Sequence, residues 1–390
     1  MCADPAPISA FTSPSSLYIG LMSGTSLDGV DGVLAALPTA GQPMATLASA
    51  YTPFPVSLRA DLMALQAAGD NELQREALAA NQLVEHYAQC IAELLEKSDV
   101  AASAVRAIGV HGQTIRHRPE LGYTRQTNNP SLLAELCGID VIADFRSRDV
   151  AAGGQGAPLV PAFHQALFGN GQQARVAVNI GGISNISILA AAGDASTTAT
   201  TTGFDTGPGN VLLDAWIMRH QDRPFDQDGA WGASGQVQSS LLQRLRSDPY
   251  FVLPPPKSTG RDLFDAAWLD NCLRDVAGLA AADVQATLSA LTASTIADAI
   301  LTHAPRTDAV YVCGGGAYNS FLLQLLEQNL ARTGKKITVH STEALGIAPN
   351  QVEALAFAWL AQRFCLQLPG NLPAVTGARG LRVLGALYPA

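Results

Sequence analysis

The sequence predicts an α/β protein built from two similar halves that face a common cleft. Apolar residues make up 48% of the 390-residue chain and charged residues 15%, with 35 glycines, a composition typical of a globular protein with glycine-rich turns. Short apolar runs alternate with stretches at helical spacing. An apolar hairpin with a small-residue tip begins at Leu17 and again at Ala174. This length is enough for two ordinary domains.

The first half opens with the hairpin Leu17–Leu37, whose polar tip we expect to be exposed. Leucine and alanine at helical spacing predict surface helices over Val56–Gly69 and Asn71–Ser98. Two short strands, Val105–Val110 and Asp140–Ala143, are each followed by a polar stretch. Ligands of α/β sheets bind beyond the carboxyl ends of the strands, so both polar stretches are candidates for the cleft.

The second half opens with a hairpin over ARVAVNI, GGISN and ISILAA. The small polar run Gly193–Gly203 predicts a mobile connection. Further helices are predicted over Gly209–Arg219, Gln236–Arg246, Arg261–Asp275 and Ala282–His303. The end of the chain predicts strand Ala309–Cys313, a glycine turn, helix Ser320–Ala331, strand Lys336–His340 and helix Asn350–Arg363. A strand, glycine turn and helix in that order allow a nucleotide to approach backbone amides.

Charge and cysteine usage exclude several classes of protein. A formal net charge of −9 disfavours binding to nucleic acid or to anionic lipid. The six cysteines are scattered without a CxxC pair, so neither a zinc site nor a disulfide framework is predicted, which favours a reducing compartment. The opening MCADPAPISAFTSPSS predicts a frayed tail and not a signal peptide, and we expect no stretch long and apolar enough to cross a bilayer. A soluble cytoplasmic protein is therefore expected.

Two glycine-containing hairpin tips are candidates for phosphate binding. The tip GTSLDG, Gly24–Gly29, supplies glycines, two hydroxyls and Asp28, which could ligate a phosphate-bound metal ion. An ordinary hairpin turn explains this segment equally well. The tip GGISN, Gly181–Asn185, has the equivalent place in the second half. The matched placement of the two tips favours phosphate binding over two unrelated turns.

Two further glycine motifs are candidates for catalysis and nucleotide binding. GFDTGPGN, Gly203–Asn210, places Asp205 directly before a helical run, where it could act as a general base in a partly desolvated cleft. The alternative is an aspartate that caps the helix. GGGAYN, Gly314–Asn319, could let adenine or ribose lie against bare backbone, or could be a simple connection.

Polar side chains follow the two strands of the first half. HGQT supplies His111, Gln113 and Thr114, and DFRSRD supplies Asp144, Arg146, Arg148 and Asp149. This mixture suits sugar hydroxyls and a carboxylate, because arginine binds carboxylates bidentately. Either arginine could instead pair with one of the neighbouring aspartates. The loop PPPKSTGRDLF, with Lys257 to Arg261, is either a lid or a solvated loop.

The strings GLMSGTSLDGVD, GHGQT, DFRSRDVAAGGQGAPLVP, NIGGISN, GFDTGPGN and GGGAYN, in this order, resemble anhydro-N-acetylmuramic acid kinases from about Tyr18 to Arg363. The resemblance implies two duplicated actin-like, ribonuclease H-like α/β domains that close over ATP and Mg²⁺. It implies domains at 1–165 and 166–390, with the C-terminal segment packing back on the first. It also implies a reaction in which water opens the 1,6-anhydro ring while O6 takes the γ-phosphoryl group, giving N-acetylmuramic acid 6-phosphate.

Carried onto this sequence, the resemblance implies Asp205 as general base and Glu353 as a second acid of the site. The implied nucleotide contacts are Gly24, Thr25, Ser26, Leu27, Asp28, Gly29, Val30, Asp31, Gly181, Gly182, Asn185, Gly207, Gly209, Asn210, Gly314, Gly315, Gly316 and Asn319. Asp28 is the expected magnesium ligand, through water. The expected sugar contacts are His111, Gln113, Thr114, Asp144, Arg146 and Arg148.

The resemblance also implies a homodimer and a role in recycling cell-wall fragments in a bacterial cytoplasm. Two alternatives remain at this point. An ordinary hexose or amino-sugar kinase would use Asp205 to deprotonate a sugar hydroxyl without ring hydrolysis. An actin-like ATPase module would bind ATP through the same turns and do no sugar chemistry.

Overall fold

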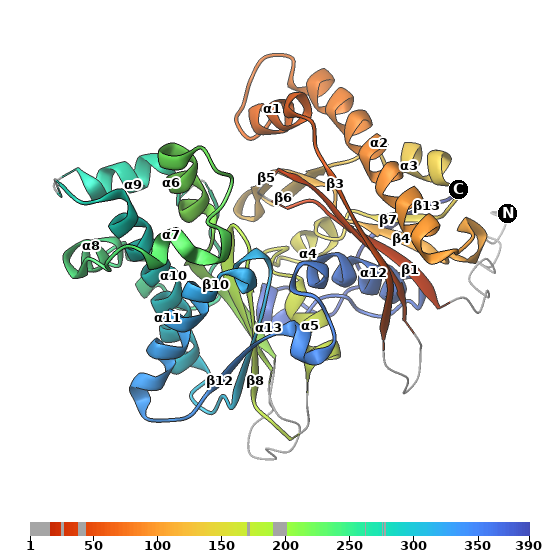
Figure 1. Ribbon diagram of the computed structural model, residues 1–390. Helices are drawn as coiled ribbons and strands as arrows, with labels where there is room; N and C mark the ends of the chain where they lie inside the picture. Colours follow the sequence, from red (N-terminus) through yellow and green to blue (C-terminus); the bar gives the residue numbers. More distant parts are fainter. Residues whose placement is uncertain are drawn as a thin grey trace, which may run out of the picture.

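The computed structural model is an α/β protein with two main sheets and a middle layer of helices between them (Figure 1). It describes residues 16–24, 27–37, 44–169, 172–189, 201–261, 263–274, 276 and 278–390. The predicted N-terminal tail at 1–15 and residues 193–200 of the predicted mobile connection lie outside the described residues.

The first sheet has the strand order β13-β7-β4-β1-β2-β3. The predicted first hairpin is confirmed, since β1 pairs antiparallel with β2, while β1, β4 and β7 run parallel. The C-terminal strand β13 pairs antiparallel with β7. The strands are β1 Leu17–Met22, β2 Gly29–Ala36, β3 Ala45–Pro53, β4 Ala107–Val110, β7 Val141–Ala143 and β13 Ala386–Tyr388.

The second sheet repeats the order of the first. Its order is β10-β9-β8-β11-β12, with β8 antiparallel to β9 and parallel to β11. When the strands of each sheet are counted in chain order and β13 is left aside, both sheets therefore have the third, second, first, fourth and fifth of their own strands as neighbours. This shared order confirms the predicted class of two duplicated α/β units. The strands are β8 Arg175–Ile180, β9 Ile183–Leu189, β10 Thr202–Pro208, β11 Ala309–Cys313 and β12 Thr338–Ser341.

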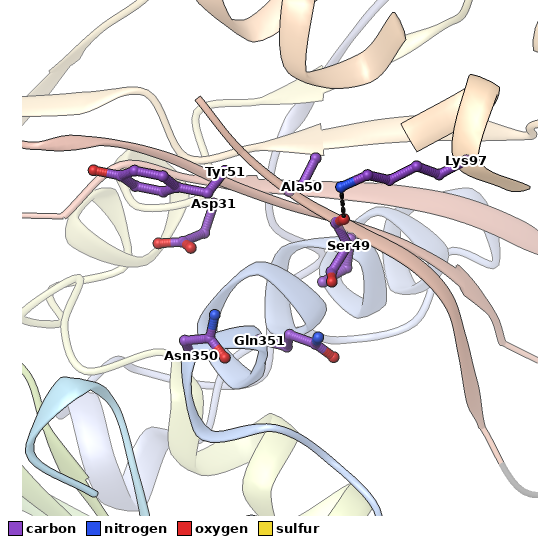
Figure 2. Close-up of a pocket in the computed structure, with 9 residues that line it drawn as sticks. Asp31, Ser49, Ala50, Tyr51, Lys97, Asn350 and Gln351 are labelled. Atoms are coloured by element: carbon purple, nitrogen blue, oxygen red, sulfur yellow. Dashed lines mark hydrogen bonds between the residues drawn. The ribbon is translucent and has the colours of Figure 1, made fainter. Parts of the chain in front are cut away.

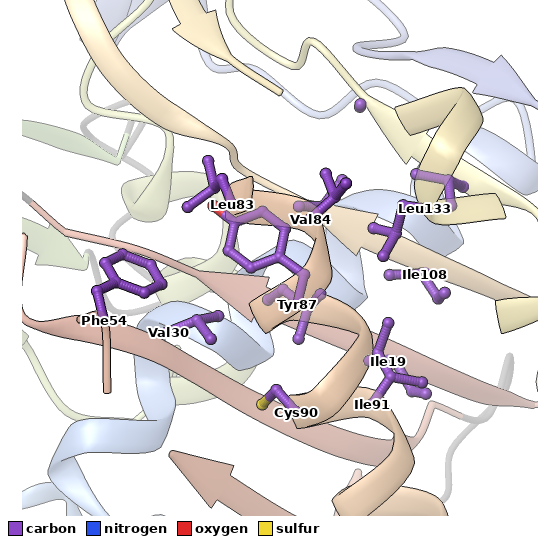
Figure 3. Close-up of a cluster of buried hydrophobic side chains, with 14 of the residues drawn as sticks. Ile19, Val30, Phe54, Leu83, Val84, Tyr87, Cys90, Ile91, Ile108 and Leu133 are labelled. Carbon is purple, nitrogen blue, oxygen red and sulfur yellow. The ribbon is translucent and has the colours of Figure 1, made fainter. Parts of the chain in front are cut away.

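Helices cover both faces of each sheet. Helix α2, Glu72–Ser98, packs on the outer face of the first sheet, where Tyr87, Leu83 and Ile91 fill the core with strand residues (Figure 3). Helices α10, Ala281–His303, and α11, Ser320–Leu330, cover the outer face of the second sheet. Between the sheets lie α5, Val160–Phe168, and α12, Val352–Cys365, whose apolar side chains contact both sheets.

Helix α12 lies so close to the first sheet that two strand positions admit only glycine. A Cβ on Gly20 of β1 would lie 1.9 Å from the carbonyl oxygen of Ala354, and one on Gly109 of β4 would lie 2.0 Å from that of Phe357. Contacts that short would require the backbone to move, so both glycines are needed for the close packing of α12 on the first sheet. The start of α12, which carries Glu353, is thereby held at the carboxyl ends of these strands.

A helical layer beside β10 forms its own core from aromatic and leucine side chains, among them Trp216, Tyr250 and Phe264. Its elements are α6 Val211–Gln221, α7 Ala230–Ala233, α8 Ser239–Leu245 and α9 Ala266–Leu273. Helix α10 is long and apolar enough to cross a membrane, so the expectation that no stretch has this property was wrong. However, 89% of its apolar window is buried inside the protein, as in a core helix.

Several elements differ from the sequence prediction. The polar stretch after β4 forms strand β5, Gln113–Arg118, paired with β6, Tyr123–Thr127. Most of GFDTGPGN forms strand β10, Thr202–Pro208, with a bulge between Asp205 and Gly207. Thr202 and Gly203, predicted to belong to the mobile connection, are the first residues of this strand. β3 and β13 were not predicted. The remaining α-helices of the described residues are α1 Val56–Ala64, α3 Pro130–Cys137, α4 Ser147–Ala151 and α13 Pro373–Thr376.

Candidate active site

Asp205 lies on β10, the outer strand of the second sheet, beneath the loop that follows Tyr250. The backbone N–H of Thr259 donates to Asp205 Oδ2 at 3.0 Å, and the N–H of Asp205 donates to the carbonyl of Lys257 at 3.2 Å. The Tyr250 hydroxyl donates to the carbonyl of Asp205 at 2.7 Å. The bulge after Asp205 and these three bonds fix the carboxylate in one orientation. Asp205 does not cap α6.

Burial raises the pKa of Asp205 to about 7, although the Thr259 N–H and the charges of Arg146 and Lys257 act in the opposite direction. A carboxylate whose pKa is raised in this way is a stronger base than an exposed aspartate and holds a proton well once it has taken one. These are the properties of a general base that works at neutral pH.

Glu353 lies in the first turn of α12 and faces the same region from the middle layer. Burial raises its pKa, and the positive charge of Arg146 and a hydrogen bond with Asn179 of β8 lower it in part. Arg146 lies within electrostatic range of both acids, since Glu353 and Asp205 each raise its pKa against a strong desolvation that brings it to about 10. The two acids and this arginine therefore form one charged cluster.

The two candidate arginines have different surroundings. Arg146 is half-buried, donates from Nε to His111 Nε2 at 3.0 Å and from Nη1 to the carbonyl of Gly156 at 2.8 Å. Arg148 is exposed. Burial, and then the charge of Arg146, hold the pKa of His111 well below its usual range, so His111 is neutral and accepts the Arg146 hydrogen bond.

Neither of the two aspartates beside these arginines forms an ion pair with them within the described part of the chain, although the charge of Asp149 acts to raise the pKa of Arg146. Asp149 is fully buried and accepts hydrogen bonds from Gly156 N, Asn371 Nδ2 and Thr376 Oγ1 at 2.7–2.9 Å, so it joins the end of the chain to α4. Asp144 is exposed, with a φ of 59°, and accepts from Ser147 N at 3.4 Å. Neither aspartate forms an ion pair with Arg146 or Arg148 among the ion pairs of the described residues.

Gln113 and Thr114 begin β5, one residue beyond His111. Gln113 Nε2 donates to the carbonyl of Gly24 at 3.1 Å, while its buried Oε1 has no partner among the described residues. The Thr114 hydroxyl accepts from Gln126 Nε2 at 3.1 Å. Gln113 thus faces the first hairpin tip, whereas Thr114 is engaged within the small β5–β6 sheet.

The first hairpin tip joins Met22 to Gly29, and of its residues Thr25 and Ser26 lie outside the described residues. Its base is anchored by Ser23, whose Oγ donates to the carbonyl of Gly112 at 3.1 Å and lies 2.7 Å from the Tyr87 hydroxyl. Leu27 is buried with a φ of 58°, and the N–H of Leu27 bonds to the carbonyl of Gly24. Asp28 is exposed at the tip.

Gly29, Val30 and Asp31 continue from this tip into β2. Val30 is fully buried in the core between α2 and the first sheet. A Cβ on Gly29 would lie 2.6 Å from the carbonyl oxygen of Thr52. Asp31 is half-buried; burial, followed by the charges of Asp28 and Glu353, raises its pKa to about 7. Asp31 therefore belongs to the same charged region as Glu353.

A polar pocket of about 230 Å³ adjoins Asp31 (Figure 2). Asp31, Ser49 and Tyr51 line it from the first sheet, and Asn350 and Gln351 line it from the segment that leads into α12. In Figure 2 the Asp31 carboxylate points toward the side on which Asn350 lies. The pocket therefore follows the seam between the first sheet and the start of α12.

The second hairpin tip is a short turn locked to α6. The carbonyl of Gly181 accepts from Asn210 N, and that of Gly182 accepts from Gly209 N and Val211 N, at 2.8–3.0 Å. A Cβ on Gly209 would lie 2.3 Å from the Gly181 oxygen, whereas one on Gly181 would meet nothing closer than 3.6 Å. The turn therefore supports the N-terminus of α6. Gly207, with a φ of 143°, follows the bulge of β10.

The glycine turn after β11 packs against the same region. A Cβ on Gly314 would lie 2.5 Å from Asn179 Oδ1, and one on Gly316 would lie 2.3 Å from the Ile180 side chain. Gly315 is exposed, and a Cβ on it would meet nothing closer than Asn210 Nδ2 at 3.5 Å; this Nδ2 itself donates to the carbonyl of Ile180. Asn319 caps α11 by accepting from Leu322 N at 2.9 Å. Gly315 is thus the member of this turn that faces outward.

Sequence reasoning did not assign a role to Asn179 or Asp214, or to Thr259 beyond its loop. Asp214, in α6, has a pKa raised to about 7 by burial, with Arg261 opposing and Asp28 adding to the shift. Asp28 of the first half is therefore in electrostatic range of α6 and of Arg261 in the second. A signal existed for two of these residues, because Asn179 and Asp214 are polar residues inside otherwise apolar runs.

The described residues contain no group of three or more His, Cys, Asp or Glu side chains that could enclose a metal ion. A magnesium site of the kind that kinases use needs only one or two carboxylates, with phosphates and water as the other ligands. The negative charge of Asp28 raises the pKa of both Asp31 and Asp214, so a cation beside Asp28 would relieve repulsion among three acids. The donor set fits magnesium.

The family model and the curated relatives agree on one family. The family model described as anhydro-N-acetylmuramic acid kinase matches residues 16–390. A protein named anhydro-N-acetylmuramic acid kinase from Paraburkholderia xenovorans is 58% identical over 390 residues, all of both chains. One of the same name from Burkholderia thailandensis is 58% identical over 96% of this chain and 97% of its own. A solved activator of a 2-hydroxyisocaproyl-CoA dehydratase from Clostridium difficile, with bound ADPNP, covers 90% of this chain and 96% of its own, at 14% identity and a TM-score of 0.46.

Proposed function

This chain belongs to the anhydro-N-acetylmuramic acid kinase family, and from that membership we propose that Asp205 is the general base of its reaction. The enzyme is a sugar kinase that uses ATP. The observation that carries the proposal is the environment of Asp205. Its carboxylate is desolvated, accepts a hydrogen bond from the Thr259 N–H and lies within range of the positive charge of Arg146.

The proposed substrate is 1,6-anhydro-N-acetylmuramic acid. Asp205 takes a proton from water as the water oxygen bonds to the anomeric carbon. The bond from that carbon to O6 breaks, and O6 bonds to the γ-phosphorus as the bond to ADP breaks. Asp205 is suited to this step because burial raises its pKa to about 7, so it is a stronger base than an exposed aspartate.

The nucleotide is proposed to lie between the two hairpin tips and the turn after β11. Gly24 to Asp31, Gly181, Gly182, Gly207, Gly209, Asn210 and Gly314 to Gly316 would surround it. Asp28, through water, would hold Mg²⁺, which supplies charge neutralisation on the transferred phosphoryl group. The shared electrostatic region of Asp28, Asp31 and Asp214 supports this location. Asn319, as the cap of α11, would support the turn instead of touching the nucleotide.

The sugar is proposed to lie beside Arg146, His111 and Gln113. Of the two arginines, Arg146 is the one we propose for the lactyl carboxylate, because it belongs to the charged cluster of Asp205 and Glu353, whereas Arg148 is exposed. Thr114 and Asp144 would contribute at the edge of this site. Glu353 would position Arg146 through their opposite charges.

At the level of the whole molecule we propose two domains, at 1–165 and 166–390, with the segment from Val352 onward packed on the first. The contacts of α12 and β13 with the first sheet support this division. We further propose a homodimer that works in the cytoplasm in the recycling of cell-wall fragments.

An isotope experiment tests the function. The enzyme is given ATP, Mg²⁺ and either the anhydro sugar or free N-acetylmuramic acid in H₂¹⁸O, and the label is located by mass spectrometry. Ring opening predicts one ¹⁸O at C1 of the 6-phosphate product. Rapid phosphorylation of the free sugar in place of the anhydro sugar would support an ordinary amino-sugar kinase, and ADP release that is indifferent to sugar would support an ATPase module.

A further inference from the structure

Three side chains form a straight row across the second sheet. Asn179 of β8 is the direct register partner of Asn185 of β9, and Asn185 is the direct partner of Asp205 of β10. Direct partners in an antiparallel pair project from the same face with their Cβ atoms roughly 4.5–5.5 Å apart. Cys313 of β11 extends the row on the other side of Asn179. The row therefore leads from Cys313 to Asp205 in steps of one strand.

Asn179 joins this row to Glu353. Its side chain is 4% exposed, and its Oδ1 accepts a hydrogen bond from Cys313 Sγ at 3.7 Å. A second side-chain hydrogen bond links Asn179 to the Glu353 carboxylate. Because the amide oxygen faces the thiol and a carboxylate can only accept, the amide N–H₂ is the donor to Glu353. The other charged groups that face Glu353 are Arg146 and Asp31.

Asn185, the register partner of Asp205, has an unused acceptor. Its Oδ1 is buried and has no hydrogen-bond partner among the described residues. Ionised Asp205 cannot supply a donor, because both of its oxygens only accept, whereas protonated Asp205 carries an O–H. A buried, unpaired acceptor is unfavourable, so the Asn185 oxygen favours the state in which Asp205 holds a proton. Thr259 N–H, Arg146, Lys257 and the Tyr250 hydroxyl, which bonds to the backbone carbonyl, are the other groups around Asp205.

We propose that the two asparagines give the two acids opposite roles: Asn179 holds Glu353 as a carboxylate by donating to it, and Asn185 accepts the O–H that Asp205 acquires from water. The proposal rests on the proposed function, in which Asp205 is the base. The proton that leaves water as its oxygen bonds to the anomeric carbon moves to Asp205, and the new O–H then donates to Asn185 Oδ1. Glu353 remains charged opposite Arg146 throughout. Asn179 and Asn185 are therefore positioning residues.

The test is the pH dependence of kcat/KM for the sugar in two variants, each chosen so that its effect on solvation opposes the predicted shift. Asn179→Ala admits water, which by itself would lower the Glu353 pKa, but loss of the donor is expected to move the acidic limb upward. Asn185→Leu adds apolar surface, which by itself would raise the Asp205 pKa, but loss of the acceptor is expected to move the limb downward. Each shift should be about half to one pH unit.

The matched control is Ser187→Ala, which removes another buried polar group from the same strand and face, where Ser187 bonds His164 at 2.8 Å. It should leave the pH profile in place. If Asn185→Leu does not fold, Asn185→Ser, which keeps a shorter oxygen acceptor, should give a smaller downward shift. Thermal unfolding of each full-length variant verifies folding.

Shifts of opposite sign with an unchanged KM for ATP would support the proposal. An upward shift that occurs in Asn185→Ser as well as in Asn185→Leu would overturn it, because Ser adds no apolar surface and the shift would then mean that the amide N–H₂ faces Asp205. If the KM for ATP rises by a larger factor than kcat falls in the Asn185 variants, Asn185 contacts the nucleotide, and this result would also overturn the proposal. A failure of the base assignment itself is seen separately, as an active Asp205→Asn enzyme.

Discussion

The two sheets share a strand order but carry different chemistry in the rows that face the middle layer. In the first sheet, Asp31 of β2 pairs with Met22 and Tyr51, so one acid stands between an apolar and an aromatic residue. In the second, Asn179 and Asn185 lead to Asp205 on the outer strand. Duplication thus supplies two matching frames, and the outer position of the second frame, covered by the loop at Thr259, carries the proposed base.

The largest expected effect compares the acids of the two rows. Asp205→Asn keeps the shape and the Thr259 hydrogen bond but cannot take a proton, so kcat should fall by about 10²–10⁴-fold with the Kd for ATP unchanged. Asp31→Asn removes an acid of similar pKa that does not take a proton from the attacking water in the proposed reaction. Its kcat should therefore fall by no more than about tenfold, as for loss of one hydrogen bond to a charged group. Steady-state kinetics and ATP titration measure both. Equal losses in the two variants would contradict the division of roles.

The second comparison concerns the hairpin tips. Asp28→Asn at the first tip should lower kcat/KM for ATP by about 10–100-fold, the loss expected for one charged ligand, and should raise the Mg²⁺ concentration needed for half-maximal rate. Asp99→Asn, an exposed aspartate with a φ of 53° at the end of α2, is the matched control. An unchanged magnesium requirement in Asp28→Asn would remove Asp28 as the ligand.

The second tip is expected to respond as a structural support. Gly209→Ala would press a methyl group against the Gly181 oxygen and should lower the free energy of unfolding by about 1–3 kcal/mol, the usual cost of overpacking. Gly181→Ala has room for its Cβ and should keep wild-type stability while weakening ATP binding if phosphate approaches its backbone. Urea unfolding and ATP titration separate the two. Equal stability in both variants would show that the lock between the tip and α6 is not needed.

The smallest expected effect is the stability of the same Asp205 variant. The pKa of Asp205 is raised on folding, so between about pH 4 and pH 7 the folded state binds the extra proton and stability falls as pH rises. Asn has no charge to bury, so Asp205→Asn should unfold less readily than the wild type at pH 8 by about 1 kcal/mol. The gain should vanish near pH 4. Destabilisation at pH 8 would show that the Asp205 carboxylate is better solvated than its burial suggests.

Much of the fold could be predicted from sequence because it depends on local patterns. Strand Ala309–Cys313 and the hairpin that opens each half lie where the apolar runs and small-residue turns predict them. Strand β10 could not be predicted from sequence, because GFDTGPGN has the composition of a turn and becomes a strand only through its pairing with β9. β13 is three residues long and is defined by its partner β7, which lies far away in sequence.

The candidate site divides in the same way. The glycine strings drew attention to the tips, yet the polar groups with unusual environments lie within strands and helices, at Asn179, Asn185, Asp31 and Asp214. The apolar runs around Asn179 and Asp214 indicate burial at these two residues, but which groups face the four side chains depends on the packing of distant elements, which no local pattern reveals. The choice between Arg146 and Arg148 likewise needed the exposure of each side chain, since both have the same neighbours in sequence.

The seat of α12 on Gly20 and Gly109 has a consequence for biosynthesis. The first sheet is translated long before the helix that covers its inner face, so on the ribosome that face waits for residues 352–365 of a 390-residue chain. Glu353 arrives with the same helix, and the last strand to emerge, β13, closes the edge of the first sheet. Nascent chains that stop before this point would expose a wide apolar surface and are expected to depend on chaperones until residues 352–365, and Glu353 with them, have been synthesised.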